Sequence, residues 1–430
     1  MDLVVKLINM KVLWITNGPI SEHRKLLDND FNQGGGWMDA AFEKVSKNTN
    51  IEIGLATVYP CKSLIKKEKG KIRYYAVPLD LSQGLYDYKN IKNTMYWQKI
   101  AADFKPDIVH IWGTEMAHSL CAIDAMPNVP KVVYLQGLMS QIYNHSGAAI
   151  DIGTKLKYFS IRSFISERGI HALDKFELFR VKIEREIIQK VGNVILENEW
   201  SAINCRVINF NCNIFRSLLP VNSLFANYDW SLMNKKPHTI FTVAGGYPIK
   251  GHHILLKALG IIKKIYPDVK LYIPGYNPLN DDKGLRQLFP TTYTKLIKSI
   301  IKKYDLYSNI VYTGKLKPPE MAENLSHCNV FVMPSAIENH SSSLIEAMMV
   351  GCPCVSSYVG GVSEYLEHGK NGFLYRYDEP ETLAGIIMDL FKNDNLCDSI
   401  SRQAKLRTRA DRQYIDIAKD FTNIYNEILL

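Results

Sequence analysis

The stretch PSAIENHSSSLIEAMMVGCP, residues 334–353, decides how the second half of this chain is built. The run VFVM at 330–333 directly before it is short and apolar, which is typical of a buried strand. Residues 344–350 predict a short helix, and Gly351 is the residue type that commonly ends one. Residues 354–357 predict the next strand. The predicted order is therefore strand, loop, helix and strand.

The start of this helix is a candidate anion site. Serines 341–343 supply candidate N-caps. Free backbone N–H groups and the positive end of the helix dipole suit a diphosphate. The carboxylates of Glu338 and Glu346 would not bind phosphate, but they could accept hydrogen bonds from ribose and sugar hydroxyls. Alternatively, Ser343 and Glu346 form a capping box, in which Glu346 only satisfies a backbone N–H.

Residues 334–364, which end in the turn GGVSE, resemble the E-x7-E signature of retaining GT-B glycosyltransferases of family 4, or glycosyltransferase group 1. The resemblance implies that Glu346 holds the nucleotide ribose and that Glu338 contacts the donor sugar. It also implies that the helix start binds the donor through Ser342, Ser343 and Leu344.

Strands and helices alternate along both halves of the chain, which predicts parallel, doubly wound sheets. A chain of 430 residues is too long for one compact core. We predict an N-terminal domain over 1–218, joined by a C-terminal helix over 412–430, and a second domain over 219–411. The resemblance implies a GT-B fold, with two Rossmann-like domains facing across a cleft and the nucleotide sugar held mainly by the second.

A diphosphate needs a cation to balance it, and Lys250 is the candidate. It follows a predicted strand and the pair Gly245-Gly246, and Gly251 comes directly after it. Most relatives have Arg at the position of Gly245, so one expected phosphate cation is missing here. Glycines 34–36 follow the first strand and would let backbone approach the donor closely, which assigns Gly35 and Gly36 to donor binding.

The acceptor side departs from the family at Gln136. Relatives often have His-Gly at this strand end, with the His near the reacting sugar, whereas this chain has Gln136-Gly137. Gln136 cannot act as a base at neutral pH, but it can hydrogen-bond a sugar hydroxyl. His118 is a second candidate for the acceptor pocket, and we assign catalysis to Glu338, His118 and Gln136. His110 lies inside an apolar strand pattern and is interpreted as structural.

Composition limits the classes of partner. The formal charge of +9 is a moderate excess that fits an anionic ligand, a membrane surface or nucleic acid, and it does not choose among them. No apolar run is long enough for a membrane-spanning helix, and the N-terminus is a poor signal peptide. The eight cysteines are interpreted as buried thiols of a reducing compartment. We expect a cytoplasmic protein, with a peripheral membrane contact through the basic and aromatic region 154–164.

No metal and no cofactor are expected beyond the donor substrate itself, and no nucleic acid partner. Asp28-Asn29-Asp30 matches the D-x-D metal motif of a different glycosyltransferase fold, but the strand that this motif needs is missing before it. It is interpreted as turn chemistry. The lysine-rich run 66–73 is interpreted as a solvated loop.

The resemblance implies a retaining hexosyl- or related transferase. It would move a sugar from a nucleotide diphosphate donor, UDP-linked in our prediction, to a hydroxyl of a saccharide or lipid-linked saccharide, in surface polysaccharide biosynthesis. Three alternatives stay open: a GT-B nucleotide-sugar epimerase, a sugar-nucleotide-binding protein without catalysis, and a dinucleotide-dependent oxidoreductase. The last needs G-x-G-x-x-G after the first strand, and residues 11–17 are not followed by that pattern.

Overall fold

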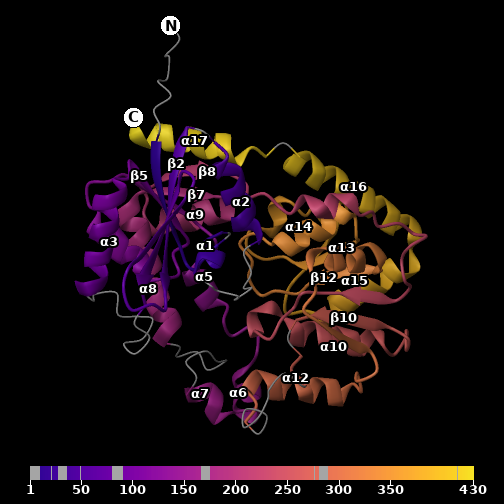
Figure 1. Ribbon diagram of the computed structural model, residues 1–430. Coiled ribbons are helices and arrows are strands. Elements are labelled where there is room, and N and C mark those ends of the chain that lie inside the picture. The colour runs from indigo at the N-terminus through magenta and orange to yellow at the C-terminus, as the bar shows by residue number, and fades with distance from the viewer. Residues whose placement is uncertain are drawn as a thin grey trace. The chain divides into compact units, whose positions relative to one another are not determined.

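The computed structural model describes residues 10–20, 22–27, 36–48, 50–79, 91–165, 175–275, 277–279, 289–413 and 415–430 (Figure 1). Its contacts divide the chain into two compact units. Unit 1 comprises Met1–Ser140, Glu177–Pro220 and Ile415–Leu430, and unit 2 comprises Gln141–Phe176 and Val221–Tyr414.

Unit 1 is built on an eight-stranded sheet in the order β3-β4-β2-β1-β5-β6-β7-β8, in which the described strands are parallel except for the pair β3 and β4. Its strands are β1 (Met10–Thr16), β2 (Ile51–Tyr59), β3 (Ile65–Lys69), β4 (Ile72–Pro78), β5 (Ile108–Trp112), β6 (Lys131–Tyr134), β7 (Asn193–Leu196) and β8 (Asn213–Arg216). Its helices are α1 (Glu22–Leu26), α2 (Gly36–Ser46), α3 (Ile91–Phe104), α4 (His118–Ala125), α8 (Lys175–Val191), α9 (Glu199–Ile208) and α17 (Ile417–Leu429).

The C-terminal helix α17 belongs to the core of unit 1, where it packs beside α2 (Figure 1). Phe421 and Tyr425 of this helix are fully buried against the aromatic side chains of β1 and β5. The Tyr425 hydroxyl lies 2.5 Å from Nδ1 of His110 and accepts a hydrogen bond from Trp14 Nε1 at 3.2 Å. Burial lowers the pKa of His110 to about 3, so this histidine is neutral and structural, in line with its position in an apolar strand.

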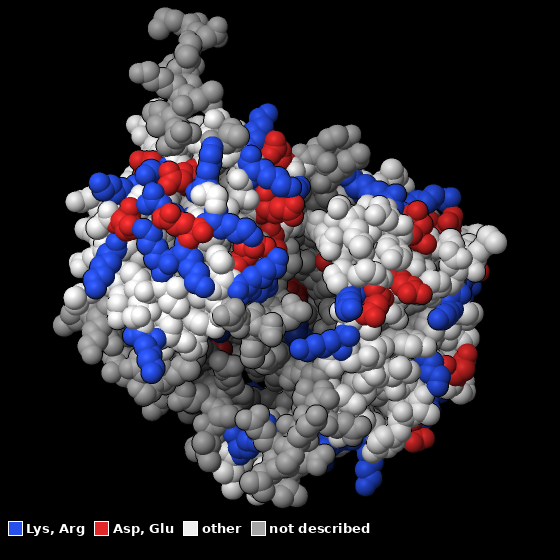
Figure 2. Space-filling model, in the orientation of Figure 1, with Lys and Arg blue, Asp and Glu red and all other residues white. Residues whose placement is uncertain are grey.

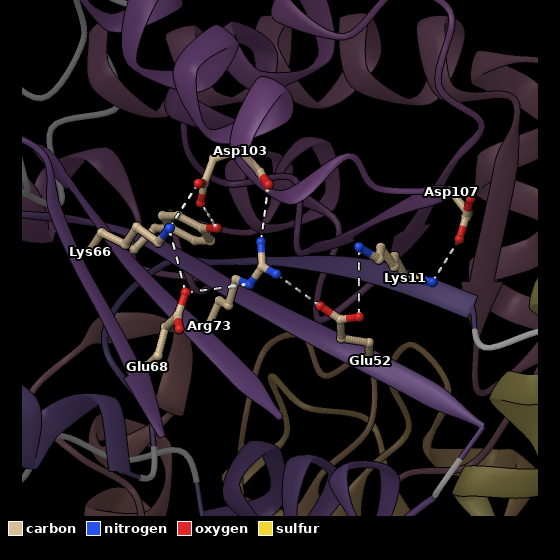
Figure 3. A network of polar contacts seen from close by, with 8 residues as sticks. Lys11, Glu52, Lys66, Glu68, Arg73, Asp103 and Asp107 are labelled. Carbon is tan, nitrogen blue, oxygen red and sulfur yellow. Dashed lines mark hydrogen bonds and ion pairs between the residues drawn. The ribbon is translucent and has the colours of Figure 1, made fainter. Parts of the chain in front are cut away.

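The lysine-rich run 66–73 is not a loop, so that interpretation was wrong. It forms most of an antiparallel hairpin of β3 and β4, with Gly70 at φ +62° in the turn. Lys66 and Arg73 form ion pairs with Glu68, Glu52 and Asp103 (Figure 3). Exposed ion pairs stabilise little, but lysines on an edge strand discourage pairing with another chain. This explains why a charged run forms a strand here.

Unit 2 contains a six-stranded sheet in the order β11-β10-β9-β12-β13-β14, and its described strands are all parallel. Its strands are β9 (Thr239–Phe241), β10 (Lys270–Pro274), β11 (Ile310–Gly314), β12 (Val330–Met333), β13 (Cys354–Ser357) and β14 (Phe373–Tyr375). Its α-helices are α6 (Ile152–Lys157), α7 (Ile161–Ile165), α10 (His252–Ile262), α12 (Thr292–Lys303), α13 (Pro318–His327), α14 (Ser342–Val350), α15 (Pro380–Lys392) and α16 (Asp394–Gln413), while α5 (Met139–Asn144) spans the boundary with unit 1. The short 3₁₀ helices within the described residues are η2 (Ser223–Asn227), η3 (Pro248–Lys250) and η4 (Val362–Glu364).

The predicted domain limits differ from these units mainly at residues 141–176, which we assigned to the first domain. The described part of this segment packs on unit 2, where His253 Nε2 lies 2.9 Å from the Ala148 carbonyl oxygen. The Tyr158 hydroxyl lies 2.6 Å from Ser299 Oγ on α12. These bonds join residues more than a hundred positions apart, so no local pattern could indicate them.

Surface and core features agree with an ordinary globular chain. Lys, Arg, Asp and Glu are interspersed over the unit 1 face shown in Figure 2. Six of the eight cysteines are buried, and all are free thiols. Within the described residues, no helix is both long and apolar enough to cross a membrane.

Candidate functional site

The sheet of unit 2 has a topological switch point between β9 and β12. From β9 the chain continues to β10 and β11 on one side, and from β12 it continues to β13 and β14 on the other. Ligands of open parallel sheets bind outside the carboxyl ends of the strands at such a point. The loop over 242–250 follows β9, and the loop over 334–341 follows β12, so these two loops form the candidate site.

Two glycines let the backbone close around the second loop. Gly251 has φ +69°, and a Cβ at this position would lie 1.6 Å from the Pro334 carbonyl oxygen. Gly360 has φ +53°, and its Cβ would lie 1.8 Å from the Glu338 carbonyl oxygen. The two loops are also tied by a 2.7 Å hydrogen bond from Ala336 N to the Ile249 carbonyl. Only glycine combines this φ with this close approach.

Lys250 and Glu338 meet across the two loops. The Lys250 ammonium donates to Glu338 Oε1 at 2.6 Å, and Ser335 Oγ donates to the same oxygen at 2.7 Å. The Glu338 side chain is only 12% exposed, whereas that of Lys250 is 40% exposed. The carboxylate is therefore fixed in orientation, and the ammonium keeps an open side that could reach an anion. The sequence analysis placed both residues in one site but indicated neither their pairing nor the role of Ser335.

The first turn of α14 presents backbone N–H groups that could donate to a ligand. The N-cap of α14 is Ser341, whose side chain accepts a hydrogen bond from Leu344 N at 3.4 Å. Ser342 and Ser343 are the first two residues of α14. Their N–H groups have no carbonyl in a preceding helical turn to bond with. Because the cap is Ser341, the capping box proposed for Ser343 and Glu346 is not formed, and that alternative was wrong.

Glu346 is a partly buried carboxyl group one turn further along α14. Among the described residues, none forms a hydrogen bond or ion pair with its carboxylate. Burial raises its pKa to about 7. Such a group needs a hydrogen-bond donor in order to hold its charge at neutral pH, and a ligand hydroxyl is one source of it.

This raised pKa predicts how stability depends on pH. The folded state holds the Glu346 proton more tightly than the unfolded chain, so stability is lost as pH rises from about 4.5 to about 7. Glu346→Gln should therefore be more stable than the wild type at pH 8, by roughly 1–3 kcal/mol, and about equal to it near pH 4.5. Urea unfolding at both pH values checks this, with the exposed Glu323→Gln as the control. Equal stability of wild type and Glu346→Gln at pH 8 would contradict the buried, unpaired carboxylate.

The remaining predicted donor residues fall into two groups. Gly245 and Gly246 lie in the loop after β9, and a Cβ on Gly245 would meet nothing within 4 Å. The missing arginine therefore leaves open space rather than a filled position. Gly35 lies outside the described residues, and Gly36 is the first residue of α2 in unit 1.

Unit 1 has its own switch point, between β1 and β5, and a polar pair lies there. Asn17 Nδ2 donates to Glu115 Oε2 at 2.9 Å. The carboxylate folds back onto Gly113, where φ is +86° and a Cβ would lie 2.0 Å from Glu115 Oε2. Burial raises the pKa of Glu115, although the Asn17 bond and backbone N–H groups oppose that shift. Sequence analysis missed Asn17, and its signal was a polar residue directly after the first strand.

His118 and Gln136 follow the neighbouring strands β5 and β6. The His118 ring stacks on Trp97 at 6.3 Å between centroids, and burial lowers its pKa to about 4. This imidazole is therefore neutral at pH 7, and its buried Nε2 has no partner among the described residues. Gln136 is half-buried at the end of β6. His118 could exchange hydrogen bonds with a hydroxyl group but could not offer it a positive charge.

Metal ligands do not cluster in the described parts of the chain, where no group of three His, Cys, Asp or Glu side chains could hold an ion. Asp28 and Asp30 of the D-x-D match lie outside the described residues.

Comparison with known proteins assigns the second half of the chain. Residues 228–407 match the family model described as glycosyl transferases group 1. This segment is a group 1 glycosyl transferase domain. The family resemblance predicted from residues 334–364 is confirmed, and both loops of the candidate site lie inside the matched range.

One relative is D-inositol 3-phosphate glycosyltransferase of Paenarthrobacter aurescens, which is 26% identical over 176 residues, or 40% of this chain and 41% of the relative. The match thus spans about two fifths of that relative. Among solved structures, sucrose-phosphate synthase from Thermosynechococcus elongatus aligns with TM-score 0.71 at 14% identity, over 97% of this chain and 99% of that one. Anabaena HepE in complex with UDP-glucose aligns with TM-score 0.65 at 16% identity, over the same shares. The fold class is GT-B, as predicted.

Proposed function

We propose that this protein transfers a glycosyl group from a UDP-linked sugar to a hydroxyl of a saccharide or lipid-linked saccharide, with retention at the anomeric carbon. The observation that carries the proposal is the pairing of Lys250 with Glu338 beside the start of α14, at the switch point of a group 1 domain. The UDP-glucose complex of HepE supports a UDP-linked donor. A role in surface polysaccharide biosynthesis is part of this proposal.

Each donor-side residue has a distinct task in this proposal. The N–H groups of Ser342 and Ser343 and the Lys250 ammonium hold the diphosphate and stabilise the charge that develops as the sugar–phosphate bond breaks. Glu346 accepts a hydrogen bond from a ribose hydroxyl. Glu338, fixed by Ser335 and Lys250, accepts one from a hydroxyl of the donor sugar.

The acceptor hydroxyl is assigned to unit 1, where Asn17, Glu115, His118 and Gln136 follow the strands next to the switch point. Burial lowers the pKa of His118 to about 4, so its neutral imidazole is a weak base. We therefore assign deprotonation of the acceptor to the departing phosphate oxygen, which is a front-face reaction without a covalent enzyme intermediate. His118 and Gln136 position the acceptor by hydrogen bonds.

The proposal is tested by incubating the full chain with a panel of UDP-sugars and saccharide acceptors and determining the anomeric configuration of the product by NMR. We expect an α-linked product from an α-linked donor and unchanged activity in EDTA. An inverted product, or activity lost in EDTA and restored by manganese, would contradict the mechanism. Conversion of the donor without an acceptor would identify an epimerase. Donor binding without turnover over the whole panel would favour a binding protein.

Glu338→Gln is the variant that separates turnover from binding. The variant loses the charged acceptor for the donor-sugar hydroxyl, which should reduce turnover by about 10- to 100-fold. UDP affinity should stay equal or rise, because Lys250 is released toward the diphosphate. Initial rates and UDP calorimetry measure the two effects, with Glu323→Gln as a control on an exposed helix surface. A fall in UDP affinity with unchanged turnover would place Glu338 on the nucleotide instead of the sugar.

A further inference from the structure

Residues 152–165 of unit 2, which we call the α6–α7 segment, attach to the rest of the unit through polar groups (Figure 1). The Tyr158 hydroxyl lies 2.6 Å from Ser299 Oγ, and Ser160 Oγ donates to the Pro290 carbonyl at 2.8 Å. Ser163 Oγ, which is buried, accepts from Thr292 N at 2.8 Å. The small polar side chains of this segment thus face the protein.

Four apolar side chains of the same segment are exposed. Ile152 and Leu156 lie four residues apart on one face of α6, and Phe159 and Ile161 follow directly. With Phe289, whose carbonyl accepts from Arg162, they form what we call the apolar face. Its five members are between 42% and 74% exposed. A helix that faces water normally exposes its polar side chains, whereas this segment exposes Ile, Leu and Phe and turns serines inward. Grouped exposed apolar residues mark an interaction site.

Within residues 152–165 and α12, all the charged side chains are basic. Residues 152–165 contain three basic residues and no acid, and α12 contains four lysines and no acid. The basic residues are Lys155, Lys157, Arg162, Lys295, Lys298, Lys302 and Lys303. Asp151 caps α6, and its carboxylate accepts hydrogen bonds from Thr154. The segment and the helix that supports it are therefore both apolar and positive.

We propose that the apolar face inserts into the headgroup region of an anionic lipid bilayer, with the surrounding basic side chains on lipid phosphates. Apolar side chains flanked by lysines on short helices are the pattern by which peripheral proteins bind an interface. The excess of basic side chains on the α6–α7 segment and α12 favours an anionic surface over a second copy of this chain. A second copy of this chain would bring like charges together, whereas an anionic surface attracts them. This inference goes beyond the transfer reaction and does not rest on it.

The test is sedimentation of the full chain with vesicles of phosphatidylcholine alone and of phosphatidylcholine with phosphatidylglycerol. We expect binding to the anionic vesicles that weakens as salt is added. Leu156→Ser with Phe159→Ser should weaken it at least tenfold, and so should Lys155→Glu with Lys157→Glu, because each basic residue near the surface contributes about fivefold. The substituted side chains lie on the surface, and circular dichroism verifies that the variants are folded.

The matched control is Val207→Ser with Met233→Ser, which removes two exposed apolar side chains outside the apolar face. This variant should sediment with vesicles as the wild type does. Equal binding of wild type to neutral and anionic vesicles, or unchanged binding of the Leu156 and Phe159 variant, would overturn the proposal. Self-association without vesicles that this variant abolishes would also overturn it, in favour of a second copy as the occupant.

Discussion

Lys250→Ala should weaken binding of UDP and of the UDP-sugar by about 10- to 100-fold. A hydrogen bond to a charged group is worth roughly 1.5–3 kcal/mol, and here two effects act in the same direction. The diphosphate loses the Lys250 ammonium, whose side chain is 40% exposed and so can reach a ligand. The Glu338 carboxylate, only 12% exposed, also loses its cation and then repels the phosphates. Calorimetry with the folded variant measures the loss.

Two further variants show which effect dominates. Lys257→Ala removes a lysine from the same region of the chain, on α10, and should leave affinity unchanged. In Lys250→Ala combined with Glu338→Ala, the repulsion is gone. Recovery of most of the affinity in this double variant would mean that Lys250 acts mainly by neutralising Glu338. Wild-type affinity in the single variant would mean that the diphosphate does not bind at this loop.

A substitution at Gly245 should increase UDP affinity, and the same calorimetry measures it. Its Cβ position is open, so an arginine fits there without displacing a neighbouring atom at that point. A guanidinium binds phosphate with two parallel hydrogen bonds. Gly245→Arg should therefore restore part of the affinity that Lys250→Ala loses. No recovery in the combined variant would show that the loop after β9 does not direct residue 245 toward the diphosphate.

The local features of this site followed from the sequence. The strand at 330–333 and the strand at 354–357 have the predicted limits, and the helix begins at Ser342, two residues before the predicted start. Such features depend on burial runs, caps and glycine, which are properties of neighbouring residues. The family match followed from the same stretch and is confirmed.

The features that depend on distant parts of the chain did not follow. The ion pair of Lys250 and Glu338 joins residues 88 positions apart, and the pair Asn17 and Glu115 joins residues 98 apart. Packing of residues 141–165 on unit 2 is set by hydrogen bonds to α12 and to its preceding loop. The capping box failed for a different reason. Three consecutive serines offered three possible caps, and tertiary contacts of Ser341, whose N–H donates to the Tyr365 hydroxyl, selected the first.

Gly251→Ala should damage both the fold and the site, although it adds a single methyl group. The left-handed backbone at φ +69° costs a non-glycine residue about 1–3 kcal/mol. In addition, the new Cβ would lie 1.6 Å from the Pro334 carbonyl oxygen, which belongs to the backbone and cannot rotate away. The loop after β12 must therefore move away from the loop after β9, and Glu338 moves from Lys250. We expect a loss of stability of about 3 kcal/mol or more and a loss of UDP affinity at least as large as in Lys250→Ala.

Gly245→Ala is the matched control, because it makes the same chemical change in the loop that ends directly before Gly251. Its Cβ would meet nothing within 4 Å and its φ is not in the left-handed region. It should change stability by no more than about 0.5 kcal/mol. Urea unfolding and UDP calorimetry on wild type and both variants compare the two positions. If Gly251→Ala unfolds too readily to bind, added UDP should still raise its unfolding midpoint less than it raises that of Gly245→Ala. Equal stability of the two alanine variants would show that the close approach of Gly251 to Pro334 does not hold the loops together.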